Sequence, residues 1–251
     1  MRVSLIQTDT QWESPAANID KARGFISRAA SEGAAIAILP EMFSTGFSMK
    51  AHSVAGAEAT EKLSSLASEN NISIIAGVAA PLREKGLNKA LVIDKSGELI
   101  AQYSKMHPFS FAGEDKHYAA GDGPVVFELG GEGSSVFICY DLRFPEVFRT
   151  VARDVKVIYV LANWPASRQE HWHALLKARA IENQCFVAGV NRVGRDGNGI
   201  EYAGGSCLYG PFGEEIFLAG DRENAYTVEL DLSLVDSTRV KYPFLNDMRI
   251  H

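Results

Sequence analysis

Three ionisable residues stand at the ends of three short apolar segments of the chain. Glu41 follows the segment AIAILP, Lys105 follows LIAQYS, and Cys139 follows SVFI. In an open α/β sheet, catalytic residues gather beyond the carboxyl ends of the strands. We therefore expect this carboxylate, this ammonium group and this thiol to share one pocket.

These three residue types suit nucleophilic attack on an amide. A protonated thiol needs a neighbouring base, and Glu41 could serve if burial raises its pKa. The oxyanion that forms would be stabilised by the Lys105 ammonium group and by the N–H of Tyr140 near a helix start. A free cysteine is more often a small core residue, and a lone Glu or Lys a solvated surface charge. Residue types and positions alone leave both interpretations open.

Length, composition and charge describe a globular chain. The 251 residues are 46% hydrophobic and 22% charged, and no linker interrupts them, so we expect a single domain over residues 1–251. The net charge of -6 argues against nucleic-acid binding. The chain has neither a signal-peptide pattern nor an apolar run of roughly 20 residues, which predicts a cytoplasmic protein with no membrane partner.

The cysteines and histidines give no metal or disulfide pattern. Cys139, Cys185 and Cys207 are odd in number and lack CxxC spacing, which predicts free thiols. Cys185 and Cys207 lie in apolar strand-like segments, where we expect them to pack in the core. His171 and His173 are two residues apart on a predicted helix and do not share a face. We predict no metal.

Apolar, β-branched segments alternate with helical ones along the whole chain. We expect a first helix with Ser14 as its N-cap and Pro15 at its first position, and a strand pair around the turn at 95–98. Other helices are expected near 57–70, 145–153 and 168–183, with strands near 2–8, 34–39, 72–78, 134–139, 155–162, 185–191, 204–209, 214–219 and 225–231. This order predicts an α/β fold of two mixed sheets with helices on their outer faces. The tail at 233–251 would either pack on a partner subunit or remain loose.

Three blocks of the sequence resemble the signature blocks of the nitrilase superfamily of carbon-nitrogen hydrolases. They are LPEMFSTG around Glu41, YSKMH around Lys105 and ICYDLRFPE around Cys139, in the order of the family. The segment ARAIENQC, which ends at Cys185, is similar to the family's helix-to-strand segment after the nucleophile. The likeness extends over essentially the whole chain.

The resemblance implies a catalytic triad of Glu41, Lys105 and Cys139 that works without a cofactor. A second glutamate of the family falls on Glu114 in the segment GEDK, either as a group that acts in catalysis or as one that holds Lys105 or a loop by hydrogen bonds. The implied fold is a four-layer α-β-β-α sandwich. The family also implies a homodimer.

Two further segments indicate which branch of this superfamily the chain resembles. True nitrilases commonly carry Trp-Glu after the cysteine, whereas this chain carries Tyr140 and Asp141. The segment NWPASRQEHW, which begins at Asn163, is similar to a loop of omega-amidases, which hydrolyse the side-chain amide of 2-oxoglutaramate. We therefore expect a small-molecule substrate of this type.

Such a substrate has an anionic 2-oxo acid end, which a cation in a partly apolar pocket would bind. Arg168 and Trp164 are candidates for that contact, with a solvated charge and a core residue as the alternatives. Phe109 and Phe111 either wall the pocket or simply pack. Arg143 is expected, together with Glu146, to pair with other charges and to fix the turn after the cysteine.

Three rival interpretations remain. One is another superfamily member, such as a carbamoylase or an amidase for a different small amide. A second is a cysteine hydrolase that pairs Cys139 with a histidine, as papain-like enzymes do. The third is a non-catalytic binding protein that keeps the fold.

Overall fold

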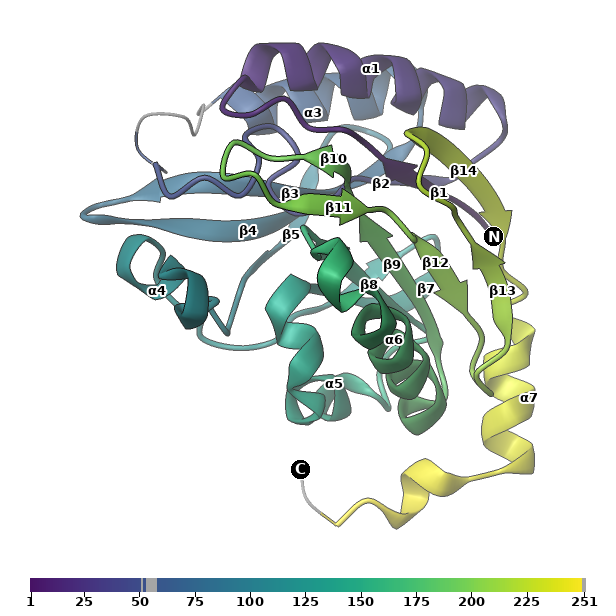
Figure 1. Ribbon diagram of the computed structural model, residues 1–251. Coiled ribbons are helices and arrows are strands. Elements are labelled where there is room, and N and C mark those ends of the chain that lie inside the picture. Colours follow the sequence, from purple (N-terminus) through teal and green to yellow (C-terminus); the bar gives the residue numbers. More distant parts are fainter. Residues whose placement is uncertain (51, 53–57, 250–251) are drawn as a thin grey trace.

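Two six-stranded mixed sheets form the centre of the molecule (Figure 1). The computed structural model describes residues 1–50, 52 and 58–249. In spatial order the first sheet contains β14 (Asn224–Glu229), β1 (Arg2–Gln7), β2 (Ile36–Ile38), β3 (Ser73–Leu82), β4 (Lys85–Ile93) and β5 (Leu99–Ser104). The second contains β13 (Glu215–Leu218), β12 (Cys207–Tyr209), β9 (Phe186–Asn191), β8 (Val157–Ala162), β7 (Glu132–Ile138) and β6 (Val126–Leu129).

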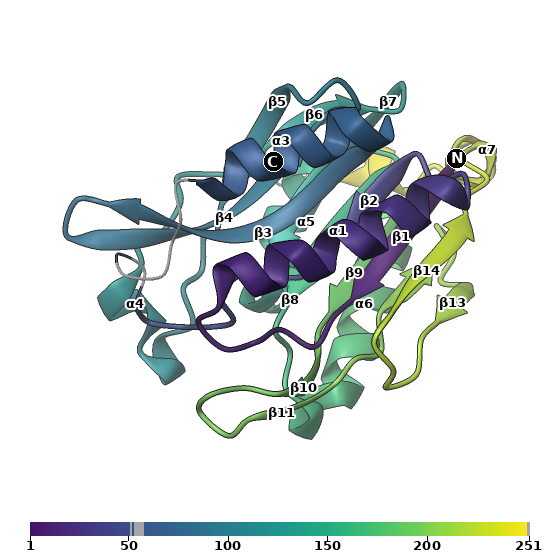
Figure 2. The same cartoon turned by 90° about the horizontal axis from the view of Figure 1, so that it is seen from above.

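Helices cover the outer face of each sheet. The first sheet is covered by α1 (Pro15–Ser31) and α3 (Glu58–Asn70), which lie side by side over its strands (Figure 2). The second is covered by α5 (Pro145–Val151) and α6 (Gln169–Asn183) on the opposite side of the molecule (Figure 1). The expected four-layer α-β-β-α sandwich is thus confirmed, although residue 57 of the expected second helix lies outside the described residues.

Alternation along the strands explains the two apolar layers of the first sheet. On β1, Val3 and Leu5 belong to the core between the sheets, whereas Ile6 belongs to the core beneath α1 and α3. Successive side chains of a strand point to opposite faces, so one strand supplies both cores. Cys185 and Cys207 are fully buried in the core that includes the second sheet, as expected.

Strand β14 is placed differently from the sequence-based expectation. The strands before it in sequence, expected near 204–209 and 214–219, lie in the second sheet, but β14 pairs antiparallel with β1 of the first, from Arg2 opposite Glu229 to Gln7 opposite Asn224. Pairing between segments more than 200 residues apart leaves no local sign in the sequence. The pairing returns the end of the chain to the first sheet.

Several short elements were not predicted. They are β6, the hairpin β10 (Val193–Arg195) and β11 (Glu201–Ala203), and the helices α4 (Glu114–His117) and α7 (Ser233–Lys241). Ser14 stands at the N-cap position of α1, but its side chain makes no capping hydrogen bond, because the backbone there is not in the extended conformation that aims the hydroxyl at the first turn.

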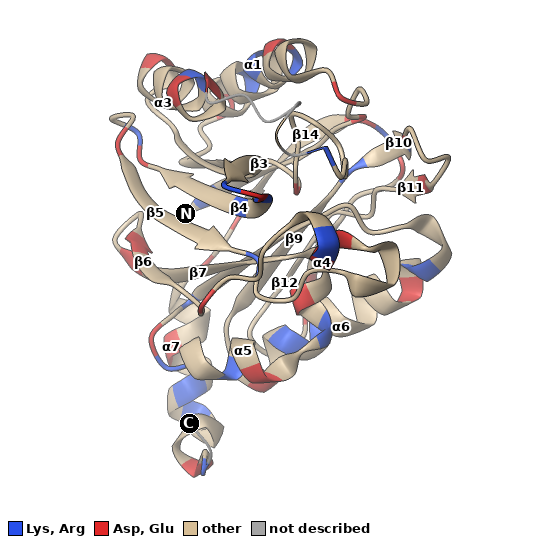
Figure 3. Cartoon of the chain, turned by 90° about the vertical axis from the view of Figure 1, so that its left-hand side faces the viewer, with Lys and Arg blue, Asp and Glu red and all other residues tan. Residues whose placement is uncertain are grey.

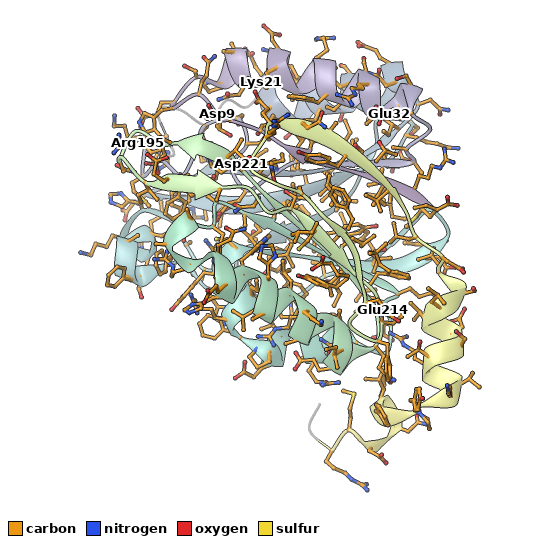
Figure 4. The ribbon with its side chains drawn as sticks, turned by 45° about the vertical axis from the view of Figure 1, so that its right-hand side comes forward. Asp9, Lys21, Glu32, Arg195, Glu214 and Asp221 are labelled. Atoms are coloured by element: carbon orange, nitrogen blue, oxygen red, sulfur yellow. The ribbon has the colours of Figure 1, made fainter. Side chains whose placement is uncertain are left out.

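The β10–β11 hairpin joins the two halves of the sandwich at one end. Val193 bridges to Asp9, and the buried Arg192 guanidinium group donates to the Asp9 carboxylate (3.2 Å) and to the Thr10 carbonyl (3.1 Å). Figure 4 shows the hairpin, marked by Arg195, beside the segment that carries Asp9. The loop beyond β1 is therefore fixed against the second sheet.

Helix α7 binds to its own chain. Arg239 donates from its guanidinium group to the carbonyl oxygens of Val155 (2.7 Å), Ala152 (2.9 Å) and Gln184 (3.0 Å), and Val235 is fully buried. The alternative of a loose tail is wrong for this helix, because its cation satisfies carbonyl groups at the ends of neighbouring elements.

Charged residues lie mainly on the outer helices and loops, and the strands carry few of them (Figure 3). Within the described part of the chain, no helix is both long enough and apolar enough to cross a membrane.

Candidate active site

Glu41 follows β2 and reaches the interface between the two sheets. It is buried, and its Oε2 accepts a hydrogen bond from the backbone N–H of Asn163 (2.9 Å), which follows β8 in the second sheet. The Asn163 side-chain amide donates to the Glu41 carbonyl oxygen (2.8 Å). The carboxylate is therefore held from both sheets.

Gly77 on β3 leaves room for the backbone of Glu41. A Cβ atom at position 77 would lie 2.5 Å from the Glu41 Cα and 2.6 Å from the Pro40 carbonyl oxygen. Contacts this short cannot be relieved without moving the backbone that carries the carboxylate.

We expect Gly77→Ala to lower the free energy of unfolding by about 1–3 kcal/mol, because it overpacks this contact, and to lower activity as well. Denaturant unfolding measures the first effect. Gly24→Ala is the matched control, since a Cβ on that α1 glycine meets no atom within 4 Å, and it should raise stability by about 0.5–1 kcal/mol. Equal stability of the two variants would contradict the proposed role of Gly77.

Lys105 follows β5 and is buried between two glutamates. Its Nζ donates to Glu41 Oε1 and to Glu114 Oε2, both at 2.8 Å. An ammonium group has three hydrogens, and Lys105 also lines the cavity described below. One N–H thus remains for an oxygen atom in that cavity.

The charges of this cluster set its protonation. Burial by itself lowers the pKa of Lys105, but Glu114 and Glu41 outweigh it and raise that pKa well above its ordinary value. Burial raises the pKa of Glu41, but the Lys105 charge and the hydrogen bonds from Lys105, Asn88 and Asn163 together outweigh it and leave the pKa below its usual value. The condition stated for Glu41, a pKa raised by burial, is thus not met by the net shift, which is downward. Glu41 is ionised at neutral pH and able to accept a proton.

Glu114, on α4, holds the loop before it. Its carboxylate accepts hydrogen bonds from Lys105 Nζ, from the Asn88 amide (2.8 Å) and from the backbone N–H of Phe109 (2.6 Å). The contacts with Lys105 and with Phe109 are those of a group that positions the lysine and a loop, and the contact with Asn88 was not expected. The structure brings Glu114 into the cluster, on the side of Lys105.

Cys139 stands at the end of β7 and begins the 3₁₀ turn Cys139–Arg143. Its φ is +46°, a left-handed conformation that side-chain-bearing residues rarely adopt, and such strain is often found at functional sites. The sulfur atom lies 3.8 Å from the Asn163 carbonyl oxygen, to which the thiol donates. Burial first, and then the negative charge of Glu41, raises the pKa of the thiol well above its ordinary value. The resting group is a thiol with a carboxylate nearby.

The turn after Cys139 presents backbone N–H groups. The first N–H groups of a helical turn have no partner within it, and Tyr140 is the second residue of this one. The N–H of Tyr140 and the free N–H of Lys105 are thus two donors for an oxyanion.

A cavity of about 250 Å³ opens over these groups. The side chains that line it include all the expected site residues except Glu114, which lies behind Lys105: Glu41, Lys105, Phe109, Cys139, Tyr140, Trp164 and Arg168. Phe111, in contrast, is 89% exposed and neither walls the cavity nor packs in the core. The β10–β11 hairpin, which was not predicted from the sequence, supplies Asn198, Ile200 and Tyr202 to the lining of the cavity.

Trp164 and Arg168 are linked to each other in the cavity wall. The Trp164 indole N–H donates to the Arg168 carbonyl oxygen (2.8 Å), and the ring is nearly fully buried. The Arg168 guanidinium carbon lies 5.7 Å from the Phe109 ring centre. Trp164 therefore packs as a core residue and also shapes the cavity.

Arg143 differs from its expected role. In the described part of the chain neither Arg143 nor Glu146 forms an ion pair; the Arg143 guanidinium group instead lies 4.9 Å from the Trp164 ring centre, contacts His171 Nδ1 at 3.3 Å and lines the cavity. Arg143 thus faces the site rather than a carboxylate of the turn.

Asp141 was also missed as a structural residue of the turn. Its buried carboxylate accepts hydrogen bonds from the Ile138 N–H (3.0 Å), the Tyr103 hydroxyl (2.7 Å) and the His107 N–H (3.0 Å). It connects the turn of the nucleophile with the strand that carries Lys105. An acidic residue in the first turn of a helical segment was the signal that could have found it.

Comparison with known proteins now adds to this geometry. A family model described as carbon-nitrogen hydrolase matches residues 2–240. The chain belongs to the carbon-nitrogen hydrolase family. The family predicted from the three sequence blocks is therefore confirmed.

Relatives of this carbon-nitrogen hydrolase cover nearly its whole length. It is 35% identical to a 2-oxoglutaramate amidase of Bacillus subtilis, over 98% of this chain and 97% of the relative. It is 37% identical to omega-amidase YafV of Escherichia coli K12, over 98% and 96%. The crystal structure of XC1258 from Xanthomonas campestris, a CN-hydrolase superfamily protein with an arsenic adduct in its active site, matches with a TM-score of 0.94 at 33% identity and covers 100% of this chain and 98% of that one.

Proposed function

We propose that this carbon-nitrogen hydrolase is an omega-amidase, which hydrolyses the side-chain amide of 2-oxoglutaramate or of a similar 2-oxo dicarboxylic acid monoamide. One observation carries the proposal: the cavity combines the Glu41, Lys105 and Cys139 cluster with two guanidinium groups, of Arg143 and Arg168, that form no ion pair within the described residues. Two relatives named for this activity support it.

In the first half of the proposed reaction, Glu41 accepts the proton of the Cys139 thiol as the sulfur attacks the amide carbon. The oxygen becomes negative and is held by the Lys105 ammonium group and the Tyr140 N–H. Glu41 then gives its proton to the departing nitrogen, and ammonia leaves. A thioester to Cys139 remains.

In the second half, water attacks the thioester. Glu41, ionised again, accepts a proton from that water, and the same two donors hold the second oxyanion. The carbon-sulfur bond breaks and the sulfur regains its proton from Glu41. The products are ammonia and a dicarboxylic 2-oxo acid, and no cofactor takes part.

The anionic end of the substrate fits the remaining wall. Arg168 and Arg143 are cations on that side, and the only lining carboxylate among the described residues, Glu41, already bonds to Lys105. A guanidinium group binds a carboxylate through paired hydrogen bonds. Asn198 on the hairpin offers further polar contact.

We expect Arg168→Met and Arg143→Met each to raise KM for 2-oxoglutaramate about tenfold or more, because a hydrogen bond to a charged group is worth about 1.5–3 kcal/mol. A neutral amide of similar length should be much less affected. Steady-state kinetics with both substrates measures the difference. Arg195→Met is the control, since Arg195 pairs with Glu201 and does not line the cavity. Equal losses on both substrates would contradict anion recognition.

The decisive experiment measures ammonia release from four compounds: 2-oxoglutaramate, glutamine, an N-carbamoyl amino acid and a simple nitrile. Strong turnover of the oxo-amide alone supports the omega-amidase. Preference for another member of the panel would replace the substrate and keep the chemistry, and turnover of none would contradict the proposal.

We further propose a cytoplasmic homodimer. Several large apolar side chains are exposed near the C-terminal helix α7, among them Val240 (83% exposed), Phe244 (58%) and Phe212 (55%). An exposed apolar group of this kind is typical of an interface. Light scattering should give a mass twice that of the 27.3 kDa chain; the mass of one chain would contradict the dimer.

A further inference from the structure

Asn88 lies at the centre of the buried charge cluster. It is 1% exposed on β4, paired with Ala79 of β3. Its carbonyl oxygen accepts a hydrogen bond from the backbone N–H of Lys105 (2.9 Å). In the order β2-β3-β4-β5, this strand lies between those that carry Glu41 and Lys105 at their ends. No role for Asn88 was predicted from the sequence.

The side-chain amide of Asn88 bridges the two glutamates. Its Nδ2 donates to Glu41 Oε1 at 2.7 Å and to Glu114 Oε1 at 2.8 Å. An amide nitrogen has two hydrogens, so both are used. The partners also fix the orientation of the amide, because an amide oxygen in that place would face two carboxylates.

Asn88 and Lys105 close a ring with the two carboxylates. Both residues donate to Glu41 Oε1, whereas at Glu114 Lys105 donates to Oε2 and Asn88 to Oε1. The ring holds two negative charges and one positive charge in a buried place. A neutral donor is needed there, since a buried carboxylate keeps its charge only when hydrogen bonds and cations stabilise it.

We propose that Asn88 is a positioning residue of the amidase: it holds Glu41 ionised and at a fixed place beside Cys139, and it keeps Glu114 apart from Glu41. This inference rests on the proposed role of Glu41 as the base. It adds a fourth member to the set of residues on which the chemistry depends. Asn88 itself does not line the cavity and acts through Glu41.

Two substitutions at this position separate positioning from packing. In Asn88→Ala the Glu41 carboxylate loses one charged hydrogen bond, and we expect kcat to fall about 10- to 100-fold with little change in KM. In Asn88→Asp a third carboxylate joins Glu41, Glu114 and Lys105. The other titratable groups that face this cluster are the Cys139 thiol and the Tyr118 hydroxyl. Like charge raises the pKa of one of the carboxylates, so the acidic limb of the pH profile of kcat/KM should move to higher pH.

A control variant, thermal unfolding and a rescue variant separate the role of Asn88 from a loss of folding. Lys89→Ala changes the next residue of β4, whose Nζ donates to Gln102 Oε1 at the surface, and should behave as wild type. Thermal unfolding identifies a variant that fails to fold, and Asn88→Ser, which keeps one donor, should then recover part of kcat. A wild-type kcat in folded Asn88→Ala, or an unmoved acidic limb in folded Asn88→Asp, would overturn the inference.

Alkylation of Cys139 by iodoacetamide tests Asn88 without any choice of substrate. The thiol must give its proton to Glu41 as it reacts, so the rate should show the same acidic limb, and Asn88→Asp should shift it to higher pH. If 2-oxoglutaramate is not hydrolysed but this shift is seen, the substrate is wrong and the role of Asn88 stands. If the oxo-amide is hydrolysed and the acidic limb moves neither in the kcat/KM profile nor in the alkylation profile, the role of Asn88 is wrong and the substrate stands.

Discussion

Cys139→Ala is expected to lower the turnover of 2-oxoglutaramate by about 10⁴-fold or more, because no thioester can form without the sulfur. The fold should persist. Alanine keeps the Cβ atom of cysteine, so the strain at φ +46° is unchanged, and the lost thiol donates to the Asn163 carbonyl group rather than holding a strand in place. Ammonia release and thermal unfolding measure the two effects.

Cys185→Ala is the matched control for the nucleophile. Cys185 is fully buried in the core of the second sheet, where burial raises its pKa to about 12. This substitution should cost stability on the order of 1 kcal/mol through a small cavity and leave kcat unchanged. Substantial turnover in Cys139→Ala would contradict the cysteine mechanism. An equal loss of turnover in both variants would show that damage to the fold, and not loss of the nucleophile, lowers activity.

Lys105→Met is expected to affect both stability and activity. The substitution leaves Glu41 and Glu114 buried without their cation, and removal of one partner from a buried ion pair costs about 3–5 kcal/mol. Activity should be lost as well, because the ammonium group is a proposed oxyanion donor. Denaturant unfolding at neutral pH measures the first effect.

The stability lost in Lys105→Met should depend on pH in a definite direction. In the wild type the pKa of Glu41 in the folded protein lies below its ordinary value. Its contribution to folding stability is therefore present above the pKa of the unfolded state and is lost as the pH falls through the folded pKa. In the variant, burial without the cation raises that pKa. The difference in unfolding free energy between the two proteins should therefore shrink from pH 7 to pH 5.

Lys62→Met is the control for a lysine that pairs on the surface. Lys62 bonds to Glu58 on α3 with its side chain 43% exposed. Exposed pairs of this kind contribute about 0–1 kcal/mol, so this variant should unfold close to the wild type. Two results would contradict the role given to the buried charges: a Lys105→Met protein as stable as Lys62→Met, or a loss of unfolding free energy in Lys105→Met that grows toward pH 5.

The local sequence determined where Glu41, Lys105 and Cys139 stand. Each follows an apolar, strand-forming segment, and the carboxyl ends of such strands meet at one edge. The two mixed sheets with helices on their outer faces also followed from local pattern, since strands buried on both faces alternate with amphipathic helices. Those arguments need only neighbouring residues, which is why they predicted the placement of the three side chains.

The tertiary structure alone decided which neutral groups hold the charges. Asn88 lies in the middle of β4 and reaches Glu41 through the order of strands within the first sheet. Asn163 follows β8 of the other sheet and reaches Glu41 only because the two sheets stack. The order of strands in the first sheet places the Lys105 ammonium group 2.8 Å from the Glu41 carboxylate, and this charge, together with the hydrogen bonds to Glu41, lowers the Glu41 pKa in spite of burial. A sequence gives burial tendency but not the distance between charges, and the electrostatic energy depends on that distance.

The sequence thus determined the chemistry that this chain can offer: a thiol, a carboxylate and an ammonium group at the ends of three strands. The fold decided how that chemistry is arranged, through contacts between residues far apart in the chain. β14 pairs with β1 across more than 200 residues, and the β10–β11 hairpin brings Tyr202 to the cavity wall. Such contacts are set by the packing of complete sheets, for which no short segment of sequence carries a signal.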